Sequence, residues 1–194
     1  MDLFLAISQG IGTSLAAGVR AFLVALLVGA MASANVGIDF DGTEYEFLES
    51  TAWLALMLVM IVGAWWVERA DIPVSPAAWA VAAAGIGAVL FAGSLAERDY
   101  TPEWGLFPGV AIAMLGFLAA RAFLGGARER LSARGESGAA GTLRLMVDLG
   151  ALVIAALAVL VEPVSYVALA FCGWVLLVRR RRTSQKYEGL RILR

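Results

Sequence analysis

Six apolar segments dominate the sequence, and each is close to the length of about 20 residues that a helix needs to cross the hydrocarbon core of a bilayer. They cover residues 8–34, 53–67, 77–95, 105–124, 145–161 and 164–178. Of the 194 residues, 61% are apolar and only 16% are charged. A soluble domain of this size lacks the interior to bury so much apolar surface. The sequence therefore predicts an all-α, polytopic membrane helical bundle with about six transmembrane helices.

The charged residues outside these segments separate by sign. The loop after the first segment carries only acids, namely Asp39, Asp41, Glu44, Glu46 and Glu49. Basic clusters follow the fourth and the last segments, at Arg128, Arg130, Arg134, Arg179, Arg180, Arg181 and Arg182. Cytoplasmic loops of membrane proteins are enriched in Lys and Arg, so this pattern predicts six spans with both termini in the cytoplasm.

Tryptophans and prolines agree with these boundaries. In the predicted orientation Trp53 and Trp104 lie at the outer interface, opposite an inner group at residues 65, 66 and 79. Membrane proteins concentrate tryptophan at both interfaces. Pro73 marks the inner turn between the second and third segments, and Pro163 marks the outer turn of the last helical hairpin.

The chain is expected to form one transmembrane domain over residues 1–182, followed by a basic cytoplasmic tail over residues 183–194. After Val178 there are seven Lys or Arg residues against one acid, Glu188. A polybasic segment beside a membrane is attracted to anionic lipids, which makes the bilayer and its anionic lipids the expected partners of the tail. The alternative is that the tail only determines topology.

The first apolar stretch is too long for one simple span. From Leu3 to Val36 it is nearly uninterrupted, which corresponds to about 50 Å of helix. Gly10 and Gly12 are candidate break points. We expect a broken or re-entrant first helix, in which a short interfacial or re-entrant piece precedes a span. Two full spans, seven in total, are the alternative.

One short motif occurs twice. Residues 20–23 and 121–124 both read Arg-Ala-Phe-Leu, each preceded by small residues. Three spans separate the copies, so they are expected to cross the membrane in opposite directions. This predicts an inverted 3+3 repeat with halves 1–96 and 104–182, the alternative being a chance match in a chain rich in Ala and Leu.

Three ionisable side chains fall within the spans: Arg20, Arg121 and Asp148. Charges inside a bilayer are costly and usually face a bundle interior or a cavity, with a partner. We predict that the arginines bind a phosphate or carboxylate group, because a guanidinium binds such groups bidentately, and that one of them pairs with Asp148 across helices. In the alternative, Arg121 snorkels to the headgroups and Asp148 pairs with Arg144 on its own helix.

Several kinds of chemistry are excluded by composition. There is no histidine, Cys172 is the single cysteine and Lys186 the single lysine. Without histidine there is no imidazole base, Ser-His-Asp triad or His-ligated metal, and one buried aspartate lacks the second carboxylate of an aspartyl dyad. We therefore expect no enzymatic activity, cofactor or metal site, and a membrane-embedded chain is not expected to bind nucleic acid.

The sequence resembles a bacterial integral-membrane family catalogued as domain of unknown function 4126. The matching residues are 18–23, Glu68, 70–73, Asp148, 151–152 and 162–163. The family's lysine before Ile72 is missing, and its usual glutamate before the aspartate is Val147 here. The resemblance implies a multi-span fold in a bacterial inner membrane and points to Arg20, Asp71 and Asp148, but it carries no established activity.

Two functions remain. The first is a small transporter or channel for an anionic solute or a lipid phosphate that binds at Arg20 and Arg121 with Asp148 as counter-charge. A homodimer is expected in this case, because six short helices enclose little volume. The second is a non-catalytic scaffold or accessory subunit whose basic tail binds a partner or anionic lipid.

Overall fold

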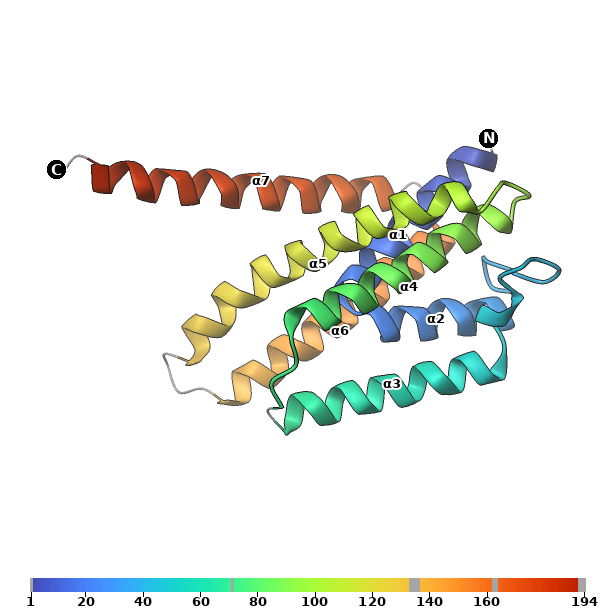
Figure 1. The fold of residues 1–194 in the computed structure, drawn as a ribbon, viewed down its shortest axis with the longest axis horizontal. Coiled ribbons are helices and arrows are strands. Elements are labelled where there is room, and N and C mark those ends of the chain that lie inside the picture. The colour runs from blue at the N-terminus through green and yellow to red at the C-terminus, as the bar shows by residue number, and fades with distance from the viewer. Residues whose placement is uncertain (1, 71, 133–136, 162–163, 192–194) are drawn as a thin grey trace.

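The computed structural model describes residues 2–70, 72–132, 137–161 and 164–191, without the side chains of residues 123–141, 143–144 and 179–191. Over these residues the chain is entirely helical, which confirms the predicted all-α fold (Figure 1). The elements are α1 Asp2–Val19, α2 Ala21–Ser33, the 3-10 turn η1 Glu46–Leu48, α3 Thr51–Arg69, α4 Pro76–Ala96, α5 Glu103–Ser132, α6 Ser137–Leu160 and α7 Val164–Arg191.

Four of the described helices are long and apolar enough to cross a membrane: α1, α3, α4 and residues Glu103–Ala122 of α5. The apolar helices Ala21–Ser33, Leu145–Leu160 and Val164–Val178 are shorter. The outer surface of the bundle is also apolar. On α3, for example, Val59 and Trp66 are each 65% exposed. An apolar exterior on helices of this length indicates a membrane protein.

The first apolar stretch is broken, as predicted, but the break lies at Arg20 and not at the glycines. Arg20 has φ −145° and ψ 80°, and α2 then returns toward the end of the bundle where α1 began (Figure 1). The two helices form a hairpin with Arg20 at its tip. The longer piece comes first, contrary to the expected short piece followed by a span.

Gly10 and Gly12 continue α1 because they serve close packing. A Cβ atom on Gly10 would lie 2.6 Å from Ser94 Oγ, and one on Gly12 would lie 3.0 Å from Ser165 Cβ. Small residues let transmembrane helices approach each other closely. The prediction of a break at these glycines is therefore wrong: their backbone stays helical while their missing side chains make room for α4 and α7.

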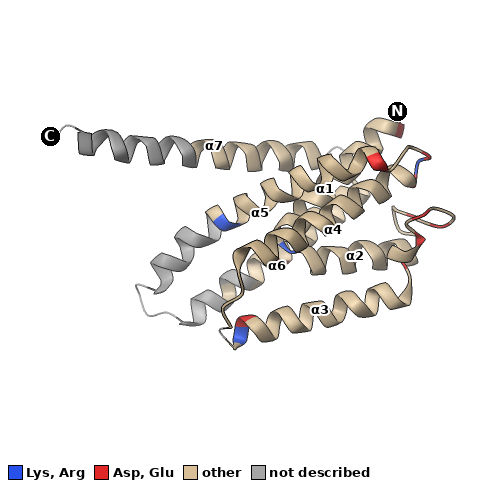
Figure 2. Cartoon of the chain, viewed as in Figure 1, with Lys and Arg blue, Asp and Glu red and all other residues tan. Residues whose placement is uncertain are grey.

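Several elements meet at one end of the bundle, which we call the acidic end because it carries the acidic loop 34–50. There the Gln9 side chain donates a hydrogen bond to the Gly37 carbonyl, and the Tyr166 hydroxyl donates one to the Phe4 carbonyl, both at 3.3 Å. Helices α1, α3, α5 and α7 begin at this end, whereas α2, α4 and α6 end there (Figure 1). Figure 2 shows most of the acidic residues gathered at this end.

The two ends of the described chain lie on opposite sides of the bundle (Figure 1). The start of α1 lies at the acidic end and the last turn of α7 lies at the opposite end. The structure therefore does not support the predicted arrangement with both termini on one face. The difference arises at the hairpin, because α1 starts at the acidic end and α2 returns to it. Trp53 and Trp104 lie in helix starts at the acidic end, whereas residues 65, 66 and 79 lie near the opposite end.

The duplicated motif lies on neighbouring helices that run in the same direction. Gly18 of α1 faces the backbone of Ala113 and Phe117 on α5, and Gly116 faces the backbone of Leu15. The two motifs thus lie on parallel helices, with Arg20 directly after the end of α1 and Arg121 within α5, 11 residues before its end. An inverted repeat requires opposite directions, so this pair of motifs does not support the predicted inverted 3+3 repeat.

We predict that the contact between α1 and α5 tolerates no added atom at Gly18. In Gly18→Ala the new Cβ would meet the Ala113 carbonyl oxygen and lie 2.8 Å from the Phe117 nitrogen. Overpacking costs about 1–3 kcal/mol, and 1 kcal/mol shifts the melting midpoint of a chain this size by about 2–4 °C. The variant should melt several degrees lower in detergent. Gly85→Ala on α4, with open space around the glycine, is the control and should melt at or above the native midpoint.

Candidate functional site

A cavity of about 500 Å³ lies where the tip of the α1–α2 hairpin meets α3, α4, α5 and α6. Among the described residues, four charged side chains line it: Arg20, Glu68, Arg121 and Asp148. The three residues predicted from the sequence thus lie around one cavity, although they are up to 128 positions apart in the chain. Glu68 joins them from the last turn of α3.

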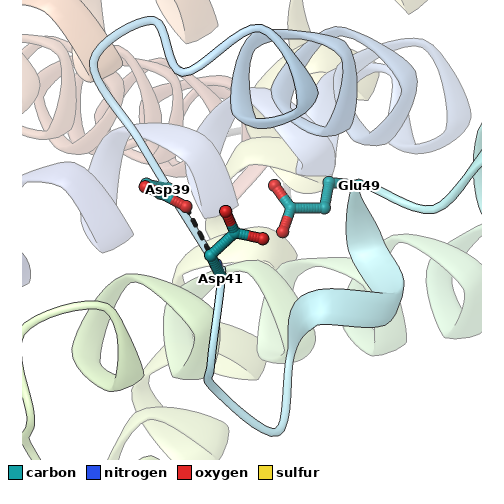
Figure 3. Close-up of side chains that lie close together, drawn as sticks. All are labelled: Asp39, Asp41 and Glu49. Atoms are coloured by element: carbon teal, nitrogen blue, oxygen red, sulfur yellow. Dashed lines mark hydrogen bonds between the residues drawn. The ribbon is translucent and has the colours of Figure 1, made fainter.

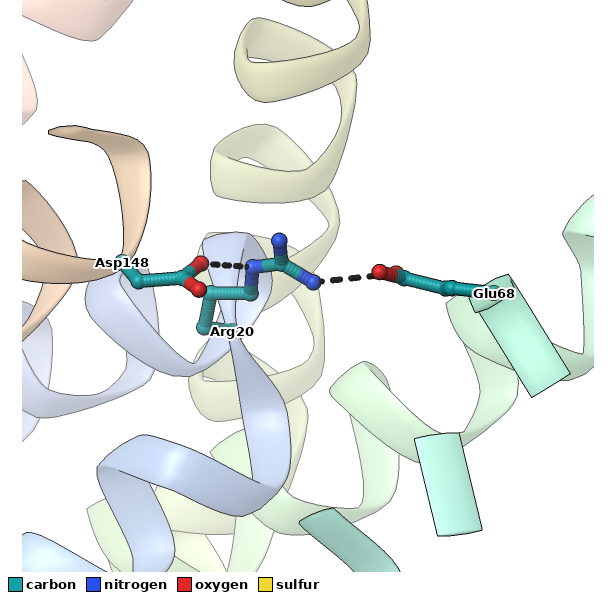
Figure 4. A network of polar contacts seen from close by, with 3 residues as sticks. All are labelled: Arg20, Glu68 and Asp148. Atoms are coloured by element: carbon teal, nitrogen blue, oxygen red, sulfur yellow. Dashed lines mark hydrogen bonds and ion pairs between the residues drawn. The ribbon is translucent and has the colours of Figure 1, made fainter. Parts of the chain in front are cut away.

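Arg20 lies between two carboxylates (Figure 4). Its Nη1 is 3.1 Å from Glu68 Oε1, and its Nε forms an ion pair with Asp148 Oδ1. The three side chains are 24–30% exposed, so they are partly shielded from solvent. The predicted pair between an intramembrane arginine and Asp148 is confirmed, with Arg20 as the partner.

The backbone break at Arg20 keeps a backbone hydrogen bond on each side of this residue. The Arg20 nitrogen still donates to the Ala16 carbonyl, and its own carbonyl accepts from the Val24 nitrogen, both at 3.0 Å. The chain therefore turns at Arg20, whose nitrogen takes part in a hydrogen bond toward α1 and whose carbonyl takes part in one toward α2. The first turn of α2 also lines the cavity, and a helix N-terminus carries partial positive charge.

Arg121 differs from Arg20 in its surroundings. It is exposed, and its guanidinium carbon lies 5.6 Å from the centre of the Phe117 ring, an arrangement typical of a cation–π contact. Among the described residues the structure shows no ion pair for it. The cavity thus has one arginine held by two carboxylates and a second one held by an aromatic ring.

The rest of the lining is largely apolar and aromatic. Trp65 on α3, Trp79 on α4 and Phe22 on α2 contribute to it, and the Phe22 and Trp79 rings meet edge to face at 6.3 Å. Helices α3 and α4 form two of the walls without packing against each other, since α3 packs only on α2 and η1 among the described elements. In the described structure no direct helix contact therefore joins α3 to α4 along the cavity.

The remaining predicted positions contribute less. Pro73 is exposed in the connection between α3 and α4. Asp71 and Pro163 lie outside the described residues, as do the side chains of Arg144 and of Arg179, Arg180, Arg181 and Arg182. Glu68 was missed as a site residue because, next to Arg69 at the end of an apolar segment, it has the pattern of an ordinary interfacial charge. The only sequence signal for it was the family resemblance.

A second polar cluster lies in the acidic loop. One carboxylate oxygen each of Asp39, Asp41 and Glu49 lies within 4.8 Å of the others (Figure 3), and the Asp41 nitrogen donates to Asp39 Oδ1 at 2.9 Å. Burial, and after it the negative charge of Asp41, raises the pKa of the Glu49 carboxyl. Exposed acidic groups often gather without a bound ion. The three carboxylates repel one another when they are ionised.

No family model, curated protein or solved structure matches this chain. The fold and the cavity therefore define it only by class, as a helical bundle with an apolar exterior and a charged cavity at one end. The resemblance to domain of unknown function 4126 stays a prediction.

We predict that Arg20 and Asp148 are energetically coupled. In a double-mutant cycle with Arg20→Gln and Asp148→Asn, the coupling free energy of unfolding should be on the order of 1 kcal/mol, as for other residues in direct polar contact. Arg98→Gln combined with Asp148→Asn is the control and should give none. A coupling within error of zero for Arg20 and Asp148 would exclude a stabilising pair.

We predict that Glu49→Gln stabilises the protein at neutral pH. A carboxyl with a raised pKa in the folded state binds its proton more tightly there than in the unfolded state, so stability falls as pH rises above its ordinary pKa. The melting midpoint of Glu49→Gln should exceed that of the native protein at pH 7, and the gain should disappear at pH 4. Glu44→Gln, outside the cluster, is the control. An equal gain at both pH values would contradict the charge repulsion.

Proposed function

We propose that this chain is a small integral membrane protein that transports an anionic solute or a lipid phosphate through the cavity around Arg20 and Arg121. The observation that carries the proposal is that both arginines line one cavity at the tip of a broken helix. Broken helices that end inside a bundle form the substrate sites of many transporters, because their free ends and side chains are available to the ligand.

The charges of the cavity suggest how an anion would be held and released. Two arginines and two carboxylates carry no net charge together. An anion that binds Arg20 therefore competes with Glu68 and Asp148 for the same guanidinium. In the empty state the carboxylates keep Arg20 paired, which avoids the cost of an uncompensated charge in an apolar surrounding. Arg121 has no such competitor among the described residues and is the group that first attracts the anion.

In this proposal the basic segments in the last parts of α5 and α7 face the cytoplasm of a bacterial cell, and the acidic end faces outward. Helices α3 to α7 then cross the bilayer, while α1 and α2 enter it from outside as a hairpin. This replaces the six spans expected from the sequence. The cavity opens near the cytoplasmic side, where the connection between α3 and α4 lines it through Ile72 and Val74.

The proposal predicts anion flux that depends on the two arginines. Purified protein in proteoliposomes should carry labelled phosphate or small carboxylates, and Arg121→Gln should slow the flux about tenfold, since a hydrogen bond to a charged group is worth about 1.5 kcal/mol. Arg20→Lys should slow it too, because an ammonium cannot bind an anion bidentately while paired.

Arg98→Gln is the matched control for this experiment, because Arg98 lies in the loop at the acidic end, away from the cavity. It should leave the flux unchanged. Equal flux in the native protein and in the Arg20→Lys, Arg121→Gln double variant would count against transport through this cavity and would favour the scaffold function expected of the basic tail.

A further inference from the structure

We infer that the ligand of this cavity is an anionic amphiphile that enters from the bilayer, with its headgroup at Arg121 and Arg20 and its hydrocarbon chain between α3 and α4. This inference rests on the proposed function and narrows its substrate class. The shared chemistry is a phosphate or carboxylate group, and what distinguishes the amphiphile is the surface that would contact its chain.

The first argument is the pattern of side chains on α3. The residues of α3 that line the cavity include Ile61, Ala64, Trp65 and Glu68. Their spacing places them on one face of the helix. This stripe is apolar toward the middle of α3 and ends in the charge of Glu68 in the last turn of the helix. An amphiphile has the same order, with its polar group toward the membrane surface and its chain toward the bilayer centre.

On α4, the lining residues also run from the helix terminus toward the middle of the bundle. Pro76, Trp79 and Ala83 line the cavity at helical spacing, so the lining leads from the start of α4 about 10 Å toward the bilayer centre. An acyl chain is longer than that. Its remainder has a route outward, because α3 and α4 do not pack against each other and α3 exposes large apolar side chains such as Val62.

The second argument is the chemistry at the mouth. Trp65 is 51% exposed, and the Arg69 guanidinium lies over its ring at 5.3 Å. An aromatic ring beside an arginine is typical of side chains at the level of lipid headgroups. A third arginine thus lies beside an aromatic residue that lines the cavity. A small hydrated anion would use these charges but would gain nothing from the apolar walls.

The experiment compares ligands that share the headgroup and differ in the chain. The purified protein in a neutral detergent is titrated with phosphatidic acid, phosphatidylcholine and inorganic phosphate. Binding of each ligand is measured by native mass spectrometry. We expect one phosphatidic acid molecule to bind per protein, and to bind more tightly than phosphatidylcholine. Inorganic phosphate should compete only weakly with phosphatidic acid. Short alkyl phosphates should bind about fourfold more tightly for each added methylene that enters the apolar part.

Two variants test the two parts of the site. Ala64→Phe adds a ring to the cavity face of α3 and should lower phosphatidic acid binding at least tenfold. Its matched control is Gly63→Phe, because Gly63 has no neighbour within 4 Å and is not part of the lining. Arg121→Gln should lower the binding of both phosphatidic acid and alkyl phosphates, whereas Arg98→Gln should not. Melting curves of all four variants show whether each is folded.

The outcomes separate this inference from the proposed function. Binding of inorganic phosphate that depends on Arg121, with no gain from a chain and no effect of Ala64→Phe, would overturn the amphiphile and leave anion transport standing. Phosphatidic acid binding that is indifferent to both variants would mean an annular lipid and would also overturn the inference. If no anion binds in an Arg121-dependent way, the inference and the proposed function both fail.

Discussion

The ion pairs of Arg20 are the interaction on which the arrangement of this protein depends. One guanidinium joins the hairpin tip to Glu68 of α3 and Asp148 of α6. An arginine among apolar helices is costly unless it is paired, and the backbone break at Arg20 lets its side chain lie between the two carboxylates. Helix α3 otherwise packs only on α2 and η1 in the described structure, so the Glu68 pair is its polar link to the hairpin tip. The same geometry leaves the space that forms the cavity.

Close packing around α1 holds the tip in position. Lipid and apolar side chains are alike in hydrophobicity, so helices in a membrane associate mainly through close contact and hydrogen bonds. Both occur here: Gly18 lies against the backbone of α5, and the Ser14 hydroxyl donates to the Gly87 carbonyl at 2.7 Å. The central helix is thus packed closely on two sides, whereas α3 packs only on α2 and η1 in the described structure. The cavity lies between these two parts of the bundle.

Predictions that depend on neighbouring residues agree with the structure, whereas several that depend on contacts between distant residues do not. The apolar segments predicted the helices closely: residues 53–67 lie within Thr51–Arg69, and residues 77–95 lie within Pro76–Ala96. Three predictions about arrangement were not supported, namely the break at Gly10 and Gly12, both termini on one face, and the inverted repeat. The second and third counted residues 8–34 as a single crossing. The helix instead breaks at its one charged residue, where the chain turns to place Arg20 between two carboxylates.

By itself the sequence determined that the chain is helical and apolar, where most of its helices lie, and which few charges occur within them, because these properties depend on composition and on local spacing. It also predicted that Arg20 or Arg121 pairs with Asp148, since an intramembrane charge needs a partner. Only the tertiary structure decided that Glu68 is the second partner, that α1 and α5 run in parallel, and that α3 and α4 stand apart. These depend on where the chain reverses direction, and that is decided by contacts between residues distant in sequence, which local patterns do not encode.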